Sequence, residues 1–139
     1  MIIYGANKAD FIKLERNPNP SGEGHYIVTA SFHDRSLIND NIFLVEPRKF
    51  MEALANFEQL RKGSATLYGS EDFEMKLEPD GGSGSLWISV LLRKNFFTGP
   101  ARANGRVKSG RITLEGGLSV DGEMMLSILQ EFSKLFGET

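Results

Sequence analysis

The stretch from residue 112 to residue 136 constrains the fold more than any other part of the sequence. Ile112 and Leu114 alternate with polar neighbours, as in a half-buried β-strand. The pair Gly116-Gly117 follows, and we expect it to break this strand in a tight turn. The amphipathic run Met124–Phe136 then predicts a helix that folds back over the sheet.

The predicted closing helix carries its own start and stop signals. Ser119 and Asp121 are favourable N-cap residues, and Asp121 and Glu123 put negative charge where the helix dipole favours it. Gly137 is a stop signal. The large apolar side chains fall on one stripe at helical spacing: Met125, Ile128, Leu129, Phe132, Leu135 and Phe136. Burial of this stripe would make the helix integral to the core.

The length and composition of the chain bound the remaining possibilities. A chain of 139 residues predicts a single domain over residues 1–139. It contains no cysteine, which excludes disulfides, thiolate metal sites and a cysteine nucleophile. A net charge of -2 predicts no global attraction to nucleic acid or to an anionic membrane. The segment Met1–Gly5 lacks the basic and long apolar parts of a signal peptide, and no run has the ~18 apolar residues of a membrane span. We therefore expect a soluble, cytoplasmic protein.

Alternating apolar residues predict most of the other strands, and amphipathic spacing predicts a first helix. The expected strands are Ile2–Tyr4, Asp10–Glu15, His25–His33, Leu37–Val45 with an interruption at Asn39–Asn41, Ala65–Tyr68, Phe73–Glu78, Leu86–Leu92 and Arg106–Leu114. Glu46-Pro47 opens the helix, because proline is favoured at the first helical position, and Lys62-Gly63 ends it. Its expected buried stripe is Phe50, Leu54, Phe57 and Leu60.

The order of these elements predicts an α+β fold. It would contain antiparallel sheet or sheets of about six to eight strands and two amphipathic helices. The two helices align when Glu46 is set against Asp121, and each follows antiparallel strands. One interpretation is a chain of two strands-then-helix halves, about residues 1–62 and 63–139. The other interpretation is that any two amphipathic helices align this well, so a true duplication stays an open question.

The order of elements also resembles a known family. The residues that carry the resemblance are Phe50, Leu54, Leu60, Gly63, Ala65 and Leu67, the strand ending in Leu77-Glu78, the glycine-rich turn, the strand Leu86–Leu92, and then Ile112, Leu114, Glu115, Asp121, Leu129 and Phe132. Over about residues 26–136 this order is similar to the WapI-type immunity proteins of bacterial polymorphic toxin systems. The resemblance implies a small cytoplasmic α+β protein that binds and neutralises a partner toxin and catalyses nothing.

Residues with catalytic or metal-binding chemistry are sparse. His25 and His33 are the only histidines, and eight residues of strand would separate them by roughly 26 Å, too far to share one metal ion. The segment Gly81–Ser85 joins two predicted strands and lacks a phosphate-loop or nucleophile-elbow pattern, so we interpret it as a hairpin turn. We expect no catalytic residues, no metal and no cofactor.

Charge is segregated along the chain. Residues 71–80 hold five acids and one lysine, and residues 93–111 hold six basic residues and no acid. Cross-strand pairing of the two segments would explain part of this pattern. The basic segment also contains Phe96-Phe97, and arginines with aromatic rings are typical both of protein interfaces and of single-stranded nucleic-acid contacts.

The predicted loop Asn95–Asn104 is our candidate contact region. It is longer than a hairpin needs, and long loops are often functional. We assign partner binding to Arg93, Lys94, Phe96, Phe97, Arg102 and Arg106. Whether the two rings are exposed or fold over the sheet edge stays open. The favoured function is a non-catalytic protein-binding module whose partner is a protein, such as a toxin domain. A nucleic-acid-binding accessory domain using residues 93–111, or an enzyme of unrecognised type, is the less favoured alternative. The sequence does not give the partner's identity, the strand order or the oligomeric state.

Overall fold

The computed structural model describes residues 1–18, 25–81, 84–97 and 109–137, and in this part of the chain it contains two antiparallel four-stranded sheets and two α-helices. The first sheet has the order β1-β2-β3-β4. Its strands are β1 Ile2–Tyr4, β2 Phe11–Arg16, β3 His25–Phe32 and β4 Arg35–Phe43, and helix α1 Pro47–Leu60 follows them.

The second sheet has the order β5-β6-β7-β8. Its strands are β5 Ala65–Gly69, β6 Phe73–Pro79, β7 Leu86–Phe97 and β8 Ser109–Val120, followed by the short 3-10 helix η2 Gly122–Met124 and helix α2 Met125–Leu135. The predicted α+β class with antiparallel sheets is confirmed, and four strands followed by one helix occur twice in the chain. The division into two halves near residue 62 stays a prediction.

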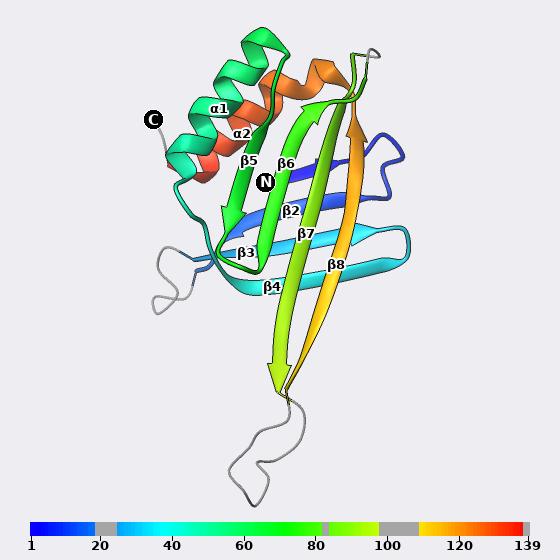
Figure 1. Cartoon of the computed structure of the whole chain (residues 1–139), viewed down its shortest axis with the longest axis vertical. Helices are drawn as coiled ribbons and strands as arrows, with labels where there is room; N and C mark the ends of the chain where they lie inside the picture. Colours follow the sequence, from blue (N-terminus) through cyan, green and yellow to red (C-terminus); the bar gives the residue numbers. More distant parts are fainter. Residues whose placement is uncertain (19–24, 82–83, 98–108, 138–139) are drawn as a thin grey trace, which may run out of the picture.

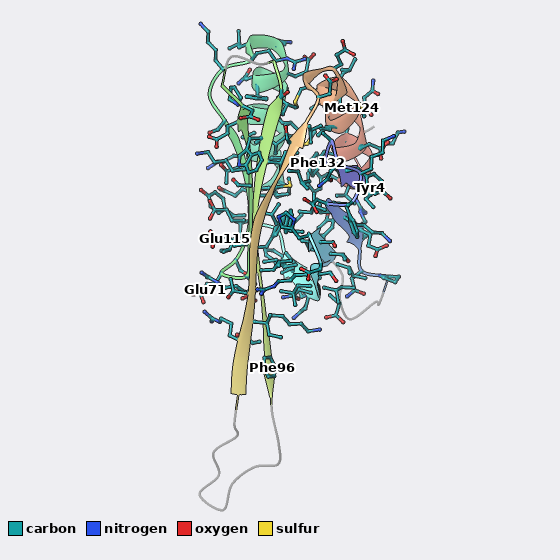
Figure 2. All side chains as sticks on the ribbon, turned by 90° about the vertical axis from the view of Figure 1, so that its right-hand side faces the viewer. Tyr4, Glu71, Phe96, Glu115, Met124 and Phe132 are labelled. Carbon is teal, nitrogen blue, oxygen red and sulfur yellow. The ribbon has the colours of Figure 1, made fainter. Side chains whose placement is uncertain are left out.

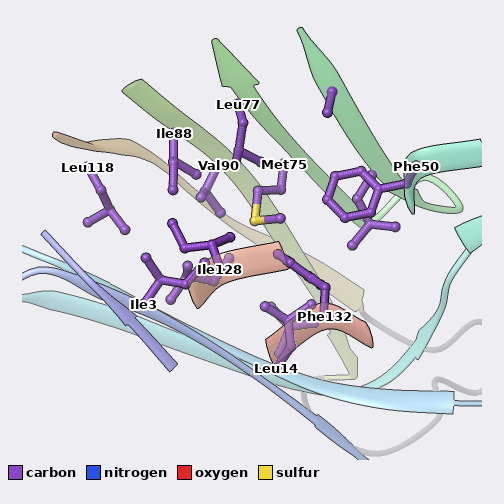
Figure 3. Packing of buried hydrophobic residues seen from close by; sticks show 14 of the residues in the cluster. Ile3, Leu14, Phe50, Met75, Leu77, Ile88, Val90, Leu118, Ile128 and Phe132 are labelled. Carbon is purple, nitrogen blue, oxygen red and sulfur yellow. The ribbon is translucent and has the colours of Figure 1, made fainter. Parts of the chain in front are cut away.

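The two sheets pack face to face, with their strands running across one another (Figure 1). The helices lie side by side at one end of the body (Figure 1). Helix α2 enters the space between the sheets: Figure 3 shows Ile128 and Phe132 between Leu14 of the first sheet and Met75 of the second. All four side chains are buried. The ring of Phe50, from α1, meets that of Phe132 edge-on at 4.9 Å, so both helices belong to one apolar core.

The interrupted strand predicted at Asn39–Asn41 is a β-bulge in β4. The pairing of β3 with β4 shifts between Tyr26 and Val28, which lie opposite Ile42 and Asn39. The Asn39 side chain is buried, and its Oδ1 accepts a hydrogen bond from the Asn41 N–H at 2.9 Å. Its Nδ2 donates to the carbonyl oxygen of Arg93 in β7 at 2.8 Å. The bulge therefore directs the buried Asn39 side chain towards β7, and its hydrogen bond to Arg93 links the two sheets.

Helix α1 begins as predicted, with Pro47 in its first turn. Phe50, Leu54 and Phe57 are buried, but Leu60 is 65% exposed, so its place in the predicted stripe was wrong. The buried positions start at Phe50 as predicted, but they end one turn earlier, at Phe57, and include Met51. Helical spacing identifies the apolar face of the helix. How far along the helix this face is buried depends on how far the packed core extends beneath it. The helix ends before Lys62, because the Arg61 backbone adopts a left-handed conformation and donates its N–H to the Phe57 carbonyl oxygen.

The predicted break at Gly116-Gly117 does not occur. Strand β8 is continuous, with Gly116 opposite Val90 and Gly117 opposite Ser89 of β7. Aromatic rings occupy the space that side chains would take at these glycines, and they come from Phe32 at Gly116 and from Trp87 at Gly117. Glycine is therefore required here for close ring packing rather than for a turn.

The start of the closing helix moves accordingly. Ser119 lies inside β8 and caps nothing, whereas Asp121 caps η2 by accepting the Glu123 N–H at 3.0 Å. Of the predicted stripe, Met125, Ile128 and Phe132 are buried, and three members pack partly buried against the core: Leu129, Leu135 and Phe136. Gly137, at φ +71°, follows the helix as predicted.

Candidate protein-binding surface

Strands β7 and β8 run past the rest of the second sheet. The last pair between β6 and β7 is Phe73–Leu92, whereas β7 pairs with β8 as far as Phe97–Ser109. Residues 93–97 and 109–113 therefore form a two-stranded ribbon, called here the projecting ribbon, which extends beyond the body of the protein (Figures 1 and 2).

The projecting ribbon corrects the predicted loop at Asn95–Asn104. Residues 95–97 belong to β7, because β8 offers them a partner at each position, with Asn95 opposite Arg111 and Phe96 opposite Gly110. The strand was missed because Asn95 and the Thr98-Gly99-Pro100 run looked like turn residues on both sides of the two rings. Residues 98–108 lie outside the described residues, and so do the predicted site residues Arg102 and Arg106.

The described members of the predicted contact set are divided between the two faces of the ribbon. Arg93 is anchored to the body, because its N–H donates to the Asp72 carbonyl at 2.8 Å and its Nη1 to the Glu71 carbonyl at 3.2 Å. Lys94 and Phe96 lie on the opposite face by alternation, and both are half-buried. The Phe96 ring lies so close to Gly110 that an added Cβ there would come within 2.6 Å of it. Phe97 ends β7.

The Phe96 ring thus lies on its own ribbon, over Gly110, and the side chain of Phe97 lies outside the described residues. Arg111 likewise binds within the ribbon, donating from Nε to Asn95 Oδ1 at 3.0 Å. The basic and aromatic residues described here therefore do not converge on one exposed patch.

A more concentrated surface lies on the side of the second sheet that faces away from the first, called here the outer face. The members relevant to binding are Tyr68 of β5, Glu74, Lys76 and Glu78 of β6, Trp87, Ser89 and Leu91 of β7, and Glu115 and Gly117 of β8. Figure 2 shows Glu71 and Glu115 on this side of the molecule. Trp87 and Leu91 make the β7 part of this surface apolar.

The outer face is hollowed beside Trp87. The indole of Trp87 lies across Gly117, in space that a side chain would otherwise fill, and remains 37% exposed. Beside it is a hollow of about 390 Å³, whose lining includes Trp87, Ser89, Leu91, Glu74 and Glu115. The small side chain of Ser89 leaves this space open, and the Trp87 ring, which covers Gly117, forms part of the lining.

Two carboxylates flank this hollow, those of Glu74 and Glu115. Glu74 and Glu115 lie on either side of Leu91 in one row across three strands, and both are exposed. Neither belongs to an ion pair among the described residues, in contrast to Glu78, which pairs with Lys76 at 3.4 Å. The hollow therefore combines an aromatic surface with unneutralised negative charge, a combination that attracts a cationic group.

The expected pairing of the acidic segment with the basic segment is not found in the described part of the chain. Its four ion pairs all join residues close in sequence: Lys13–Glu15, Glu46–Lys49, Lys76–Glu78 and Glu131–Lys134. Arg93 does reach the acidic segment, but it donates to the Glu71 backbone carbonyl rather than to a carboxylate. Among the described residues, Glu71, Asp72 and Glu74 therefore form no ion pair with the basic segment.

The other residues with site chemistry have structural surroundings. His25 packs edge-on against Phe43 at 5.8 Å, and no group of three or more His, Cys, Asp or Glu in the described ranges is placed to hold a metal ion. Asp10 accepts the His33 N–H at 2.8 Å and the Asn7 Nδ2–H at 3.0 Å. The backbone hydrogen bond from His33, followed by that from Asn7, lowers the pKa of Asp10 from its ordinary value. These bonds close the turns beside β2 and β3.

The candidate surface is thus formed by residues of β6, β7 and β8. Sequence reasoning found the acids of β6, but it did not find that Glu115 and Gly117 lie on the same surface, because the pairing of β8 with β7 has no local signal. Among the described residues, no helix has the length and apolar character needed to cross a membrane.

Comparison of the chain with protein-family models, with curated proteins and with solved structures finds no match.

Proposed function

We propose that this protein is a non-catalytic protein-binding module of the immunity-protein kind, and that the outer face of its second sheet binds a basic surface of a partner protein. The observation that carries the proposal is the exposed indole of Trp87 beside the carboxylates of Glu74 and Glu115, which belong to no ion pair within the described ranges. Tryptophan is the residue type most enriched among binding hot spots, and a sheet face that holds one exposed is suited to a partner.

The chemistry of the hollow favours an arginine or lysine side chain as the group it receives. Such a side chain would place its positive charge against the indole ring, where the carboxylates of Glu74 and Glu115 would also attract it. A cation–π contact at an exposed site contributes ~0.5–1 kcal/mol, so the surrounding sheet face must supply the rest of the affinity. The acidic segment around β6 extends the same sign of charge beyond the hollow.

Trp87 is the only tryptophan and therefore reports on this site without labelling. Two short peptides would serve as probes, acetyl-Gly-Arg-Gly-amide and its citrulline analogue, which has the same shape without the charge. We expect the arginine peptide to shift the indole NMR signal and the fluorescence of Trp87, and the citrulline peptide to have little effect. An equal response to both peptides would contradict the proposed cationic recognition.

Matched variants separate this hollow from general attraction to an acidic protein. Glu74→Gln should weaken binding of the arginine peptide by about threefold, as expected for one exposed charge. Glu52→Gln, which removes an exposed acid from α1, should leave it unchanged. An equal loss in both variants would show that the peptide senses only net charge.

The resemblance to WapI-type immunity proteins supports a toxin domain as the natural partner and the cytoplasm as the place of action. If the gene directly upstream of this one encodes a toxin, the product of that gene is the first partner to test by calorimetry. Trp87→Ala should weaken that complex by ~2 kcal/mol or more, as hot-spot residues do. Tight binding that survives this change would place the interface elsewhere, and the projecting ribbon would then be the first surface to examine.

Nucleic acid is the second candidate partner, because residues 93–111 carry six basic residues and no acid. Counterion release would make such binding fall steeply with salt, with a log–log slope of about -0.7 per phosphate contacted on a single strand. A shallow salt dependence, or no retention of a mixed-sequence single-stranded oligonucleotide in 150 mM salt, would exclude this candidate.

A further inference from the structure

Strand β8 is the last strand of the second sheet, and among the described residues most of its outer edge is unpaired. Strand β7 pairs with one side of β8 along its whole length. On the other side, the described residues supply one backbone hydrogen bond, from the Ala6 N–H to the Ser119 carbonyl oxygen at 2.8 Å. An open edge is a template for another strand.

That single hydrogen bond also shows which residues present their backbone groups outward. In an antiparallel pair, alternate residues point both N–H and C=O away from their partner strand. Because the Ser119 carbonyl points outward, the same holds at every second residue back along β8, at Gly117, Glu115, Thr113 and Arg111. Four consecutive outward positions are enough to pair with a strand of similar length.

The side chains along this edge are complementary to themselves. Arg111 and Glu115 stand two residues before and two residues after Thr113, on the same face of the strand. If a second β8 lies antiparallel with Thr113 opposite Thr113, Arg111 of each copy lies opposite Glu115 of the other. Shifting the register by one or two residues removes this pairing. Opposite charges directly across a strand pair stabilise it.

The same register would also stabilise the projecting ribbon. A two-stranded ribbon is only marginally stable in water. Here residues 109–113 of one copy would lie beside residues 113–117 of the other, so each ribbon gains a third strand from the body of its neighbour. Ile112, which is 50% exposed, would lie opposite Leu114 of the second copy on the inner face.

We propose that two copies of this chain associate through antiparallel pairing of β8 with β8, centred on Thr113, to form one continuous eight-stranded sheet. The two-fold axis makes the contact isologous and closed, which gives a dimer rather than a fibre. Trp87 and Glu74 lie on the sheet face and not on this edge, so the dimer leaves them accessible. Glu115 is shared by both proposals, because in the dimer it would pair with Arg111 of the second copy and add less negative charge to the hollow.

A cysteine cross-link tests the register directly, because the natural chain has no cysteine. Opposite residues in such a pair have Cα atoms ~5.5 Å apart, within the range that a disulfide spans. Thr113→Cys should therefore become a covalent dimer of twice the 15.5 kDa chain mass on mild oxidation. Ser119→Cys is the matched control in the same strand, and it should form no covalent dimer under the same conditions because this register does not bring the two copies of residue 119 together.

Charge variants test the self-complementarity independently of cross-linking. By sedimentation, Arg111→Glu and Glu115→Arg should each weaken the dimer by about tenfold, because each replaces two attractive pairs with two repulsive ones. Equimolar mixing of these two variants should restore a dimer, since every position then faces an opposite charge. The variant with both changes should dimerise like the parent.

Two outcomes would overturn the proposal. One is a parent chain that sediments as a monomer at 0.5 mM and whose Thr113→Cys variant does not cross-link faster than Ser119→Cys. In that case Arg111 and Glu115 act as charges that keep an edge strand unpaired. The other is a dimer that persists unchanged in both single charge variants, which would place the interface on another surface.

Discussion

The ring of Phe32, on β3, lies against the backbone of Gly116, on β8, so closely that an added Cβ would come within 2.6 Å of the ring's Cγ. This contact joins the inner faces of the two sheets at a point where neither strand has room for a larger residue. It explains why a glycine that reads as a strand breaker lies in the interior of the longest pair of strands.

Gly116→Val should therefore destabilise the protein. Its side chain would displace the Phe32 ring, and overpacking of this kind typically costs ~1–3 kcal/mol. Urea unfolding measures the change, with Thr113→Val in the same strand as the control. Thr113 is exposed, so that variant should stay within ~0.5 kcal/mol of the parent. Equal stability of Gly116→Val and the parent would show that the sheets are not in contact here.

Helix α2 should contribute to stability through its buried face alone. Phe132 is fully buried between the sheets and contacts Phe50, so Phe132→Ala should cost ~3–5 kcal/mol. Leu126, on the same helix, is 52% exposed, and Leu126→Ala should cost less than ~1 kcal/mol. Chemical denaturation of both variants checks the prediction. Similar costs at the two positions would mean that the helix does not enter the core as Figure 3 shows.

Phe96 should matter little for global stability. Its ring packs on Gly110 of the projecting ribbon, beyond the last residue pair between β6 and β7. Phe96→Ser should leave the melting temperature within ~4 °C of the parent, because losses of less than ~1 kcal/mol have effects of this size. The backbone amides of residues 93–97 should meanwhile exchange faster with solvent. A fall in melting temperature as large as that of Phe50→Ser would show that the ring belongs to the core.

Asp10 should give stability that disappears in acid. Hydrogen bonds from the His33 N–H and from Asn7 favour its charged form and lower its folded pKa below the unfolded value of ~3.9. The contribution is therefore fully present above pH ~3.9 and is lost as the pH falls through the folded pKa. Asp10→Asn should be less stable than the parent at pH 7, and this difference should shrink in unfolding experiments below pH ~4. A difference that stayed constant down to pH 2 would contradict this assignment.

The sequence by itself determined the elements whose signals are local. The alternation of Phe73, Met75 and Leu77 with charged residues marks β6, because a strand presents successive side chains to opposite faces. Pro47 places the start of α1 and Asp121 provides a cap, since both act through the backbone of their own turn. The α+β class follows from the order of these elements, and so does the acidic outer side of β6.

Only the tertiary structure decided features that depend on a distant partner. Gly116 and Gly117 continue a strand because rings from Phe32 and Trp87 occupy their missing side-chain volume. Asn95 and Phe96 extend β7 because β8 lies beside them, although their neighbours in sequence resemble turn residues. The hollow beside Trp87 is likewise a product of register, which brings Glu74 and Glu115 from separate strands to the two sides of Leu91. Local propensities are worth a few tenths of a kcal/mol per residue, and strand pairing and ring packing outweigh them at these positions.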